Sequence, residues 1–212
     1  MYVPSHFRVE DPAKIAAFMG RYSFATFITN DGTAPFASHL PMLFTPEKGG
    51  QGVLLAHMAR ANSQWQHFAA GREALAIFHG PHTYISPSWY KTDLAVPTWN
   101  YAVVHAYGVP RIFNERERIL SLMRETISAY ESSFAQPWPG ELPEDYRDKM
   151  IQGIVAFEMP VNRVEAKFKL GQNRPAADSQ SVFEALSRAT DHDSRALAEL
   201  MIIEGHARVN EK

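Results

Sequence analysis

The chain has 212 residues, of which 45% are hydrophobic and 21% are charged, and its formal net charge is −2. This apolar content excludes an intrinsically disordered chain, and the slightly acidic balance gives no electrostatic support to sequence-independent nucleic-acid binding. The absence of cysteine excludes disulfide scaffolds, thiolate zinc sites and cysteine nucleophiles.

The first part of the chain predicts one helix followed by a series of strands. Asp11 is a good N-cap, Pro12 suits the first helical position, and Gly20 can end this helix. Aromatic and β-branched runs separated by turn residues then indicate strands joined by hairpins. The expected strands in this part are residues 23–29, 34–44, 52–57 and 74–79, with an extension over 83–86 after a turn at Gly80 and Pro81.

A polar turn after the third strand leads into a short helix over 63–70, which Asn62 caps and Gly71 ends. A helix N-terminus exposes unpaired N–H groups and partial positive charge, which together suit an anion. Arg60 adds a guanidinium that can hold phosphate through two hydrogen bonds, and Ser63 adds a hydroxyl. An ordinary capped helix with a surface arginine explains the same residues, and spacing alone favours that interpretation.

The remaining part alternates strands with helices. Gly108 and Pro110 mark a bend between two strands, and Asn114 is the expected cap of the longest helix, over 115–132. Apolar residues recur in that helix at helical spacing, and a proline-rich loop over 136–143 follows it. The other expected elements are strands over 101–107, 109–113, 153–159 and 164–170 and helices over 146–152, 179–189 and 194–204.

This order of elements predicts the fold class. Strands joined mostly by hairpins favour an antiparallel barrel over a parallel sheet, so we expect a mainly β fold with peripheral helices. We expect one barrel domain over 1–175 and a helical C-terminal extension over 176–212 packed on it. The last two helices are largely apolar and the second carries a single arginine, which favours a packing hairpin over a DNA-binding helix-turn-helix.

Three further clusters are candidates for ligand binding. The aromatic segment 89–101 includes Trp99 and can stack on a planar cofactor, although core or dimer interface is the favoured alternative. The chain has nine histidines without an HExxH pattern, so structural roles are favoured over a metal site. His39, beside Ser38, is a polar residue within an expected strand, where it could contact the edge of a cofactor. The run 167–174 holds three cations and two amides, and an anionic ligand and a solvated strand edge explain it equally well.

Five runs of sequence together resemble the PaiB-type FMN-binding negative transcriptional regulators. In chain order they are MYVPSHF, HMARANSQW, FHGPHTYISPSWY, VPTWNYAVVHAYG and KFKLGQNR, and the resemblance extends from residue 1 to about 175. That family is part of the FMN-binding split-barrel group, which includes pyridoxamine 5′-phosphate oxidase. The resemblance therefore implies a split β-barrel, a homodimer and FMN near the dimer interface. The sequence departs from the family pattern at Ser63, where proline is expected, and at Gly171, where serine is expected.

The resemblance also implies where the cofactor binds. The turn at the start of helix 63–70 is expected to hold the FMN phosphate, and the second strand of the hairpin is expected to run beside the flavin ring. Residues late in the chain are expected to close the site. The implied FMN-binding residues are Ser38, His39, Arg60, Asn62, Ser63, Gln64, Trp99, Lys169 and Gln172. No catalytic residue and no metal ligand is assigned.

The resemblance implies a negative transcriptional regulator, and an FMN-dependent oxidoreductase acting on a small molecule is the alternative. A split barrel that holds haem or no cofactor is a third interpretation. DNA is a partner by resemblance only, because net charge and the C-terminal helices do not support it. No signal peptide or membrane span is evident, so we expect a soluble, cytoplasmic protein without a membrane partner.

Overall fold

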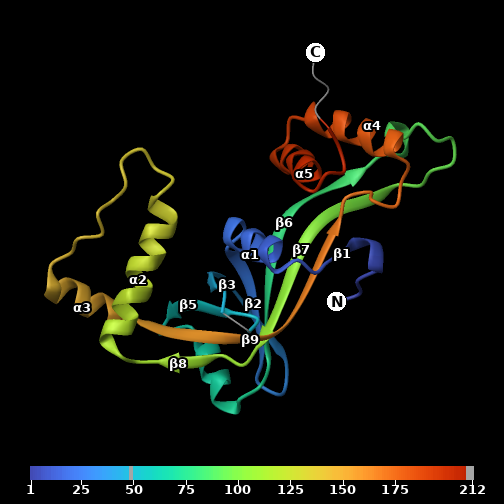
Figure 1. The fold of residues 1–212 in the computed structure, drawn as a ribbon. Helices are drawn as coiled ribbons and strands as arrows, with labels where there is room; N and C mark the ends of the chain where they lie inside the picture. The colour runs from blue at the N-terminus through green and yellow to red at the C-terminus, as the bar shows by residue number, and fades with distance from the viewer. Residues whose placement is uncertain (48–49, 209–212) are drawn as a thin grey trace. The chain divides into compact units, whose positions relative to one another are not determined.

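A nine-stranded sheet runs through residues 1–47 and 50–208, the part of the chain that the computed structural model describes (Figure 1). The strands follow the order β3-β2-β6-β7-β9-β5-β4, and β1 and β8 each pair with β9. β2 pairs antiparallel with β3 and β6, and β9 pairs antiparallel with β1, β5 and β8. The strands are β1 (Arg8–Val9), β2 (Phe24–Asn30), β3 (Pro35–Pro41), β4 (Leu43–Thr45), β5 (Val53–Ala59), β6 (Ala74–Ile85), β7 (Thr98–Gly108), β8 (Arg111–Phe113) and β9 (Ile154–Lys169).

Helices lie between the strands and near both ends of the chain, as expected. The α-helices are α1 (Pro12–Arg21), α2 (Arg116–Glu131), α3 (Glu144–Gln152), α4 (Ala176–Ser187) and α5 (His192–Ile203), and the 3₁₀ helices are η1 (Ser5–Phe7), η2 (Ser63–Ala70) and η3 (Pro87–Trp89). Within the described residues, no helix is long and apolar enough to cross a membrane.

The chain divides into two compact units. Unit 1 contains residues 1–18, 79–104 and the chain from 165 onward, and unit 2 contains 19–78 and 105–164. Strands β6, β7 and β9 each contribute residues to both units. The domain boundary expected at residue 175 stays a prediction, and residues 209–212 of the expected C-terminal extension lie outside the described part of the chain.

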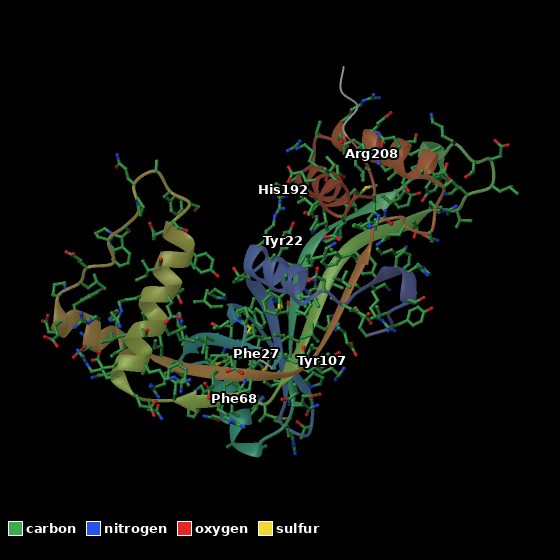
Figure 2. The ribbon with its side chains drawn as sticks, in the orientation of Figure 1. Tyr22, Phe27, Phe68, Tyr107, His192 and Arg208 are labelled. Atoms are coloured by element: carbon green, nitrogen blue, oxygen red, sulfur yellow. The ribbon has the colours of Figure 1, made fainter. Side chains whose placement is uncertain are left out.

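Aromatic residues form the centre of unit 2. The ring centroids of Phe27 and Phe157 are 5.2 Å apart, and those of Phe68 and Phe157 are 5.0 Å apart. Figure 2 labels Phe27 and Phe68. Phe27 and Phe157 are completely buried, and alternate residues of β2 and β5 are buried in the same way. This packing joins η2 to the sheet, because Phe68 belongs to that helix.

Unit 1 has its own apolar contacts. The rings of Phe18 and Phe168 lie 4.9 Å apart, and Gly80 leaves room for Phe18, because a Cβ there would lie 2.6 Å from that ring. α4 and α5 bury apolar side chains that include Leu186 and Leu197, and α5 also contacts β6 through Ser194, whose hydroxyl is 3.1 Å from that of Thr83. α4 and α5 therefore bury apolar faces, as expected for a packing hairpin of helices.

Two predicted interruptions of strands are wrong. The expected turn at Gly80 and Pro81 lies inside β6, which is one strand of 12 residues. Likewise, the two strands expected over 153–159 and 164–170 form the single 16-residue β9. Residues that often form turns are extended in these strands because neighbouring strands pair with them. Pro160 of β9, for example, pairs with Val53 of β5. Conversely, the strand expected over 34–44 is divided at Met42 into β3 and β4.

Helix starts were predicted with mixed success. Asp11 caps α1 as expected, because its Oδ1 accepts a hydrogen bond of 2.9 Å from the Ala13 N–H. Asn114 is not the cap of α2; Glu115 occupies that position in an extended conformation without a capping side-chain bond. The helix over 63–70 begins and ends where predicted, but it is a 3₁₀ helix, and its following residue, Gly71, has φ +60°.

Candidate functional site

The start of η2 brings two predicted cofactor residues together. Asn62 caps the helix, because its Oδ1 accepts a hydrogen bond of 3.0 Å from the Gln64 N–H. The other side of the same amide donates from Nδ2 to the Ser38 hydroxyl of β3, at 2.8 Å. Asn62 therefore fixes the turn against the strand that is expected to run beside the flavin ring.

Gln64 is completely buried and holds two strands together. Its Nε2 donates to the carbonyl oxygens of Phe27 and Phe36, at 3.0 and 3.1 Å, and lies 3.2 Å from the Thr29 hydroxyl. The Oε1 atom has no hydrogen-bond partner among the described residues. The amide thus positions the turn on β2 and β3, and its direct contact with FMN stays a prediction.

Arg60 is exposed, and its guanidinium is anchored on the backbone of unit 2. Nε donates to the Gln152 carbonyl and Nη2 donates to the Ile154 carbonyl, both at 2.7 Å. Trp65 Nε1 also donates to the Arg60 carbonyl, at 3.0 Å. The arginine is therefore held in one place, and Nη1 is the guanidinium nitrogen without a hydrogen bond to the described residues.

Ser63 and His39, like Arg60, are exposed residues of unit 2 that were predicted to bind the cofactor. The Ser63 hydroxyl makes no hydrogen bond with the described part of the chain, so it is available to an anion at the helix start. His39 lies on β3, which is the last strand at one end of the sheet order, and its Nδ1 is 3.2 Å from the Thr26 hydroxyl. The Phe24 ring stacks on His39 and is 65% exposed, which leaves an apolar surface at this strand.

Trp99 and Lys169 lie together in unit 1. Lys169 Nζ donates to the Trp99 carbonyl at 2.7 Å and also to the Thr98 hydroxyl. Burial lowers the pKa of Lys169, and the nearby positive charges of Lys167 and Arg174 lower it further. The Trp99 ring is about half exposed and its centroid is 5.7 Å from that of His82. This indole has an accessible face, as stacking on a planar group requires.

Gln172 closes its own turn. Its Oε1 accepts from the Leu170 N–H at 2.7 Å, and its Nε2 donates to the Phe168 carbonyl. Gly171, between them in the chain, has φ +90°, which favours glycine over the serine expected there. Both polar atoms of the Gln172 side chain are therefore engaged by backbone, and its contact with FMN stays a prediction.

The histidines serve the fold in several places. His67 Nδ1 is 2.9 Å from the Thr29 hydroxyl, and burial lowers the pKa of His57. Within residues 1–47 and 50–208, no three histidine, aspartate or glutamate side chains gather as metal ligands would. Sequence reasoning did not identify Ser38 as the partner of Asn62 or Gln152 and Ile154 as the partners of Arg60, because these pairs are distant in the chain.

Known proteins share both the sequence pattern and the fold. The family described as "Putative FMN-binding domain" matches residues 1–163. "Protease synthase and sporulation protein PAI 2" of Bacillus subtilis is 35% identical over 203 residues, which cover 95% of this chain and 96% of that protein.

Two solved structures share the fold at low sequence identity. The flavocytochrome Anf3 of Azotobacter vinelandii is 11% identical, with a TM-score of 0.61 over 79% of this chain and 72% of that one. The FAD and haem binding protein of Mycobacterium smegmatis is 11% identical, with a TM-score of 0.53 over 76% of this chain and 73% of that one. With the antiparallel sheet and several helices, these likenesses confirm the predicted split-barrel fold class. The family match confirms the expected cofactor, FMN, and the chain belongs to this family of FMN-binding domains.

Proposed function

We propose that the protein is an FMN-binding negative regulator of transcription. The observation that carries this function is the 35% identity to the "Protease synthase and sporulation protein PAI 2" of Bacillus subtilis. The similarity covers 95% of this chain, so it includes most of the C-terminal helices as well as the sheet. When bound, FMN supplies a redox-active flavin ring, and the regulator and the alternative oxidoreductase therefore differ in their partner and not in their fold.

The turn at Arg60 and Ser63 is proposed to hold the FMN phosphate. The Ser63 hydroxyl and Nη1 of Arg60 have no other hydrogen bonds in the described chain, and both are exposed donors near the start of η2. Charge-assisted hydrogen bonds to phosphate suit these groups. Ser38 and His39 are proposed to line the flavin ring, while Trp99, Lys169 and Gln172 remain predicted cofactor contacts.

A homodimer is proposed as the functional form. Phe24 and Phe36 are 65% and 38% exposed, and Phe36 belongs to the terminal strand β3. Exposed aromatic side chains on such a strand are typical of a buried interface in an assembly. We expect a twofold dimer that buries more than about 2,000 Å² in total. Light scattering at micromolar concentration tests this, and a monomer contradicts it.

Arg60→Ala tests the phosphate site. Loss of a charge-assisted contact is expected to weaken FMN binding about ten- to a hundredfold, whereas riboflavin, which lacks the phosphate, should bind both proteins alike. Flavin-fluorescence titration measures both ligands, and Arg111→Ala, an exposed arginine of the same unit, is the control. Unchanged FMN affinity removes Arg60 from the site. An equal loss for riboflavin assigns the effect to the lost carbonyl anchors at Gln152 and Ile154.

DNA binding tests the regulatory function. The FMN-loaded and FMN-free proteins are to be compared in mobility-shift assays on promoter fragments over a range of salt concentrations. A direct repressor shifts specific fragments, and its affinity falls as salt rises. If no fragment shifts in either form, direct repression is wrong and the oxidoreductase becomes the leading function.

A further inference from the structure

Three cations lie close together in unit 1, at the end of β9. Lys167 and Lys169 are two residues apart on that strand, so their side chains share one face of the sheet, and Arg174 follows the turn at Gly171. Burial lowers the pKa of Lys169, and the positive charges of Lys167 and Arg174 lower it further, so the three cations are near enough to repel one another. By itself this arrangement is electrostatically unfavourable.

A solvated strand edge does not explain these cations. Lys167 pairs with Arg8 of β1, and β9 also lies next to β7 in the sheet, so β9 is not an edge strand at this point. Lys167 is only 7% exposed, and Lys169 and Arg174 are half-buried. Charged side chains are rarely buried unless an opposite charge accompanies them. The burial therefore favours a bound anion over solvent as the partner of the cluster.

The protein itself supplies no acid to the three cations, because none of them forms an ion pair with another described residue. The two acids nearest to the cluster in the chain are engaged elsewhere. Glu165 accepts a hydrogen bond from the N-terminal ammonium group. Asp178 accepts from the N–H groups of Lys91 and Thr92, at 2.8 and 3.2 Å, and also from the Thr92 hydroxyl. The positive charge of the cluster is thus left without a counter-charge in the described chain.

Two of the cations keep N–H donors for a ligand. The Arg174 guanidinium makes no hydrogen bond with the described residues, and its central carbon lies 4.5 Å from the centroid of the Tyr90 ring. That ring holds the guanidinium by a cation–π contact and leaves its donors free. Lys169 donates to the Trp99 carbonyl and the Thr98 hydroxyl, which uses two of its three protons. Arg174 is therefore the principal free donor, and Lys169 is the second.

Lys167 is held between tyrosine rings. Its Nζ lies 5.4 and 5.2 Å from the ring centroids of Tyr2 and Tyr101, and it donates to the Tyr2 carbonyl at 3.2 Å. These contacts stabilise an ammonium group without neutralising it. Lys167 therefore contributes positive charge to the cluster, while its burial leaves direct contact with a ligand to the other two cations.

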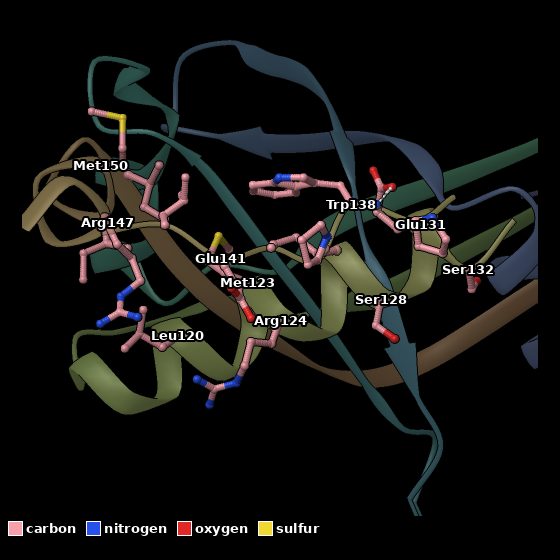
Figure 3. A pocket seen from close by; sticks show the side chains of 17 residues that line it. Leu120, Met123, Arg124, Ser128, Glu131, Ser132, Trp138, Glu141, Arg147 and Met150 are labelled. Atoms are coloured by element: carbon pink, nitrogen blue, oxygen red, sulfur yellow. Dashed lines mark hydrogen bonds between the residues drawn. The ribbon is translucent and has the colours of Figure 1, made fainter. Parts of the chain in front are cut away.

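A cleft in unit 2 has balanced charges by comparison. It is formed by α2, the proline-rich loop, α3 and the start of β9, and its volume is about 950 Å³ (Figure 3). Its lining is mostly apolar, as at Trp138, and its charged residues are two arginines and two glutamates, namely Arg124, Arg147, Glu131 and Glu141. These charges balance within the lining, so the cleft requires no counter-ion, whereas the cluster in unit 1 does.

We propose that Arg174 and Lys169 bind a phosphate monoester, with Lys167 adding positive charge to the site. A phosphate monoester carries nearly two negative charges at neutral pH and offers three acceptor oxygens, so it matches three cations better than a carboxylate does. A guanidinium can bind two phosphate oxygens at once, and a lysine binds phosphate as a point charge. The phosphate belongs either to FMN, a source that rests on the FMN-binding function proposed above, or to a second ligand.

Calorimetric titration of FMN-loaded protein with phenyl phosphate tests for a second ligand. Arg174→Gln should weaken binding about ten- to a hundredfold, and Arg174→Lys, which keeps the charge, should weaken it less. Arg188→Gln is the matched control, because Arg188 is an exposed arginine of the same unit outside the cluster. It should bind phenyl phosphate like the parent protein.

Titration of FMN-free protein with FMN and riboflavin tests the other source. If the cluster holds the FMN phosphate, Arg174→Gln weakens FMN binding about ten- to a hundredfold and leaves riboflavin binding unchanged. Arg60→Ala reports separately on the turn of unit 2, so failure of that turn is distinguished from failure of the cluster. The proposal is overturned if Arg174→Gln alters neither phenyl phosphate binding nor the preference for FMN over riboflavin. An equal loss of phenyl phosphate binding in Arg188→Gln overturns it as well.

Discussion

Gln64 and Gln172 both lie in turns that were predicted to hold the cofactor, yet their side chains bond to different parts of the chain. The Gln64 amide reaches the carbonyls of Phe27 and Phe36, which are 37 and 28 residues away. The Gln172 amide bonds to Leu170 and Phe168, which are two and four residues away. One glutamine connects strands of the sheet, and the other shapes a single turn.

The difference shows that a polar residue in a predicted site can serve the fold in two ways. A tertiary bond in a fully buried position, as at Gln64, is formed only when both strands are in place. A local bond, as at Gln172, requires only the turn itself. Ser63, next to Gln64 in the chain, and Trp99, whose carbonyl accepts from Lys169, are exposed residues with free surface for a ligand.

Gln64→Met should have the largest effect on stability. The substitution keeps the length of the side chain but removes a buried donor, so three oxygen atoms lose a partner. We expect the free energy of unfolding to fall by about 3 kcal/mol. Urea denaturation measures this free energy. A loss below about 1 kcal/mol would contradict the proposed difference between the Gln64 and Gln172 turns.

Asn62→Ala should have an intermediate effect. It removes the cap of η2 and the bond to Ser38, and loss of a cap costs about 1 kcal/mol. Asn114→Ala is the matched control, because the Asn114 side chain caps nothing in the structure. Equal losses in the two variants would contradict the role given to Asn62.

Gln172→Met should be milder than the same substitution at Gln64. Its bonds are local and partly buried, so we expect a loss of about 0.5–1 kcal/mol in the free energy of unfolding. The measurement is the same urea titration. A loss as large as that of Gln64→Met would mean that the late turn also supports distant structure.

The strands that lead into the two turns should each give a small rise in stability with pH, one on the acid side and one on the alkaline side of the profile. Burial lowers the pKa of His57 and of Lys169, so the unfolded chain keeps a proton that the folded chain has released. Stability therefore rises with pH up to about the ordinary pKa values, 6.5 for histidine and 10.5 for lysine. His57→Gln should flatten only the acid rise, and Lys169→Met only the alkaline rise, in thermal melts across pH. If neither substitution changes the dependence of melting temperature on pH, burial of these two groups is not the cause of the rises.

The sequence determined the features that depend on near neighbours. Asn62 caps η2 through a residue two positions ahead, and Asp11 caps α1 in the same way, so residue type and spacing were sufficient. The hairpin of β2 and β3 around Asn30 follows for the same reason. The family, the cofactor and the split-barrel class were also predictable, because several separate runs keep their order in the chain.

Only the tertiary structure decided which polar groups are committed to the fold. Arg60 bonds to carbonyls 92 and 94 residues away, and Gln64 is buried by strands that precede it in the chain. The continuity of β6 through Gly80 and the cleft beside Trp138 likewise depend on packing between distant segments. Local propensity carries no information about such partners, because they come together only when burial of apolar surface brings the segments into contact.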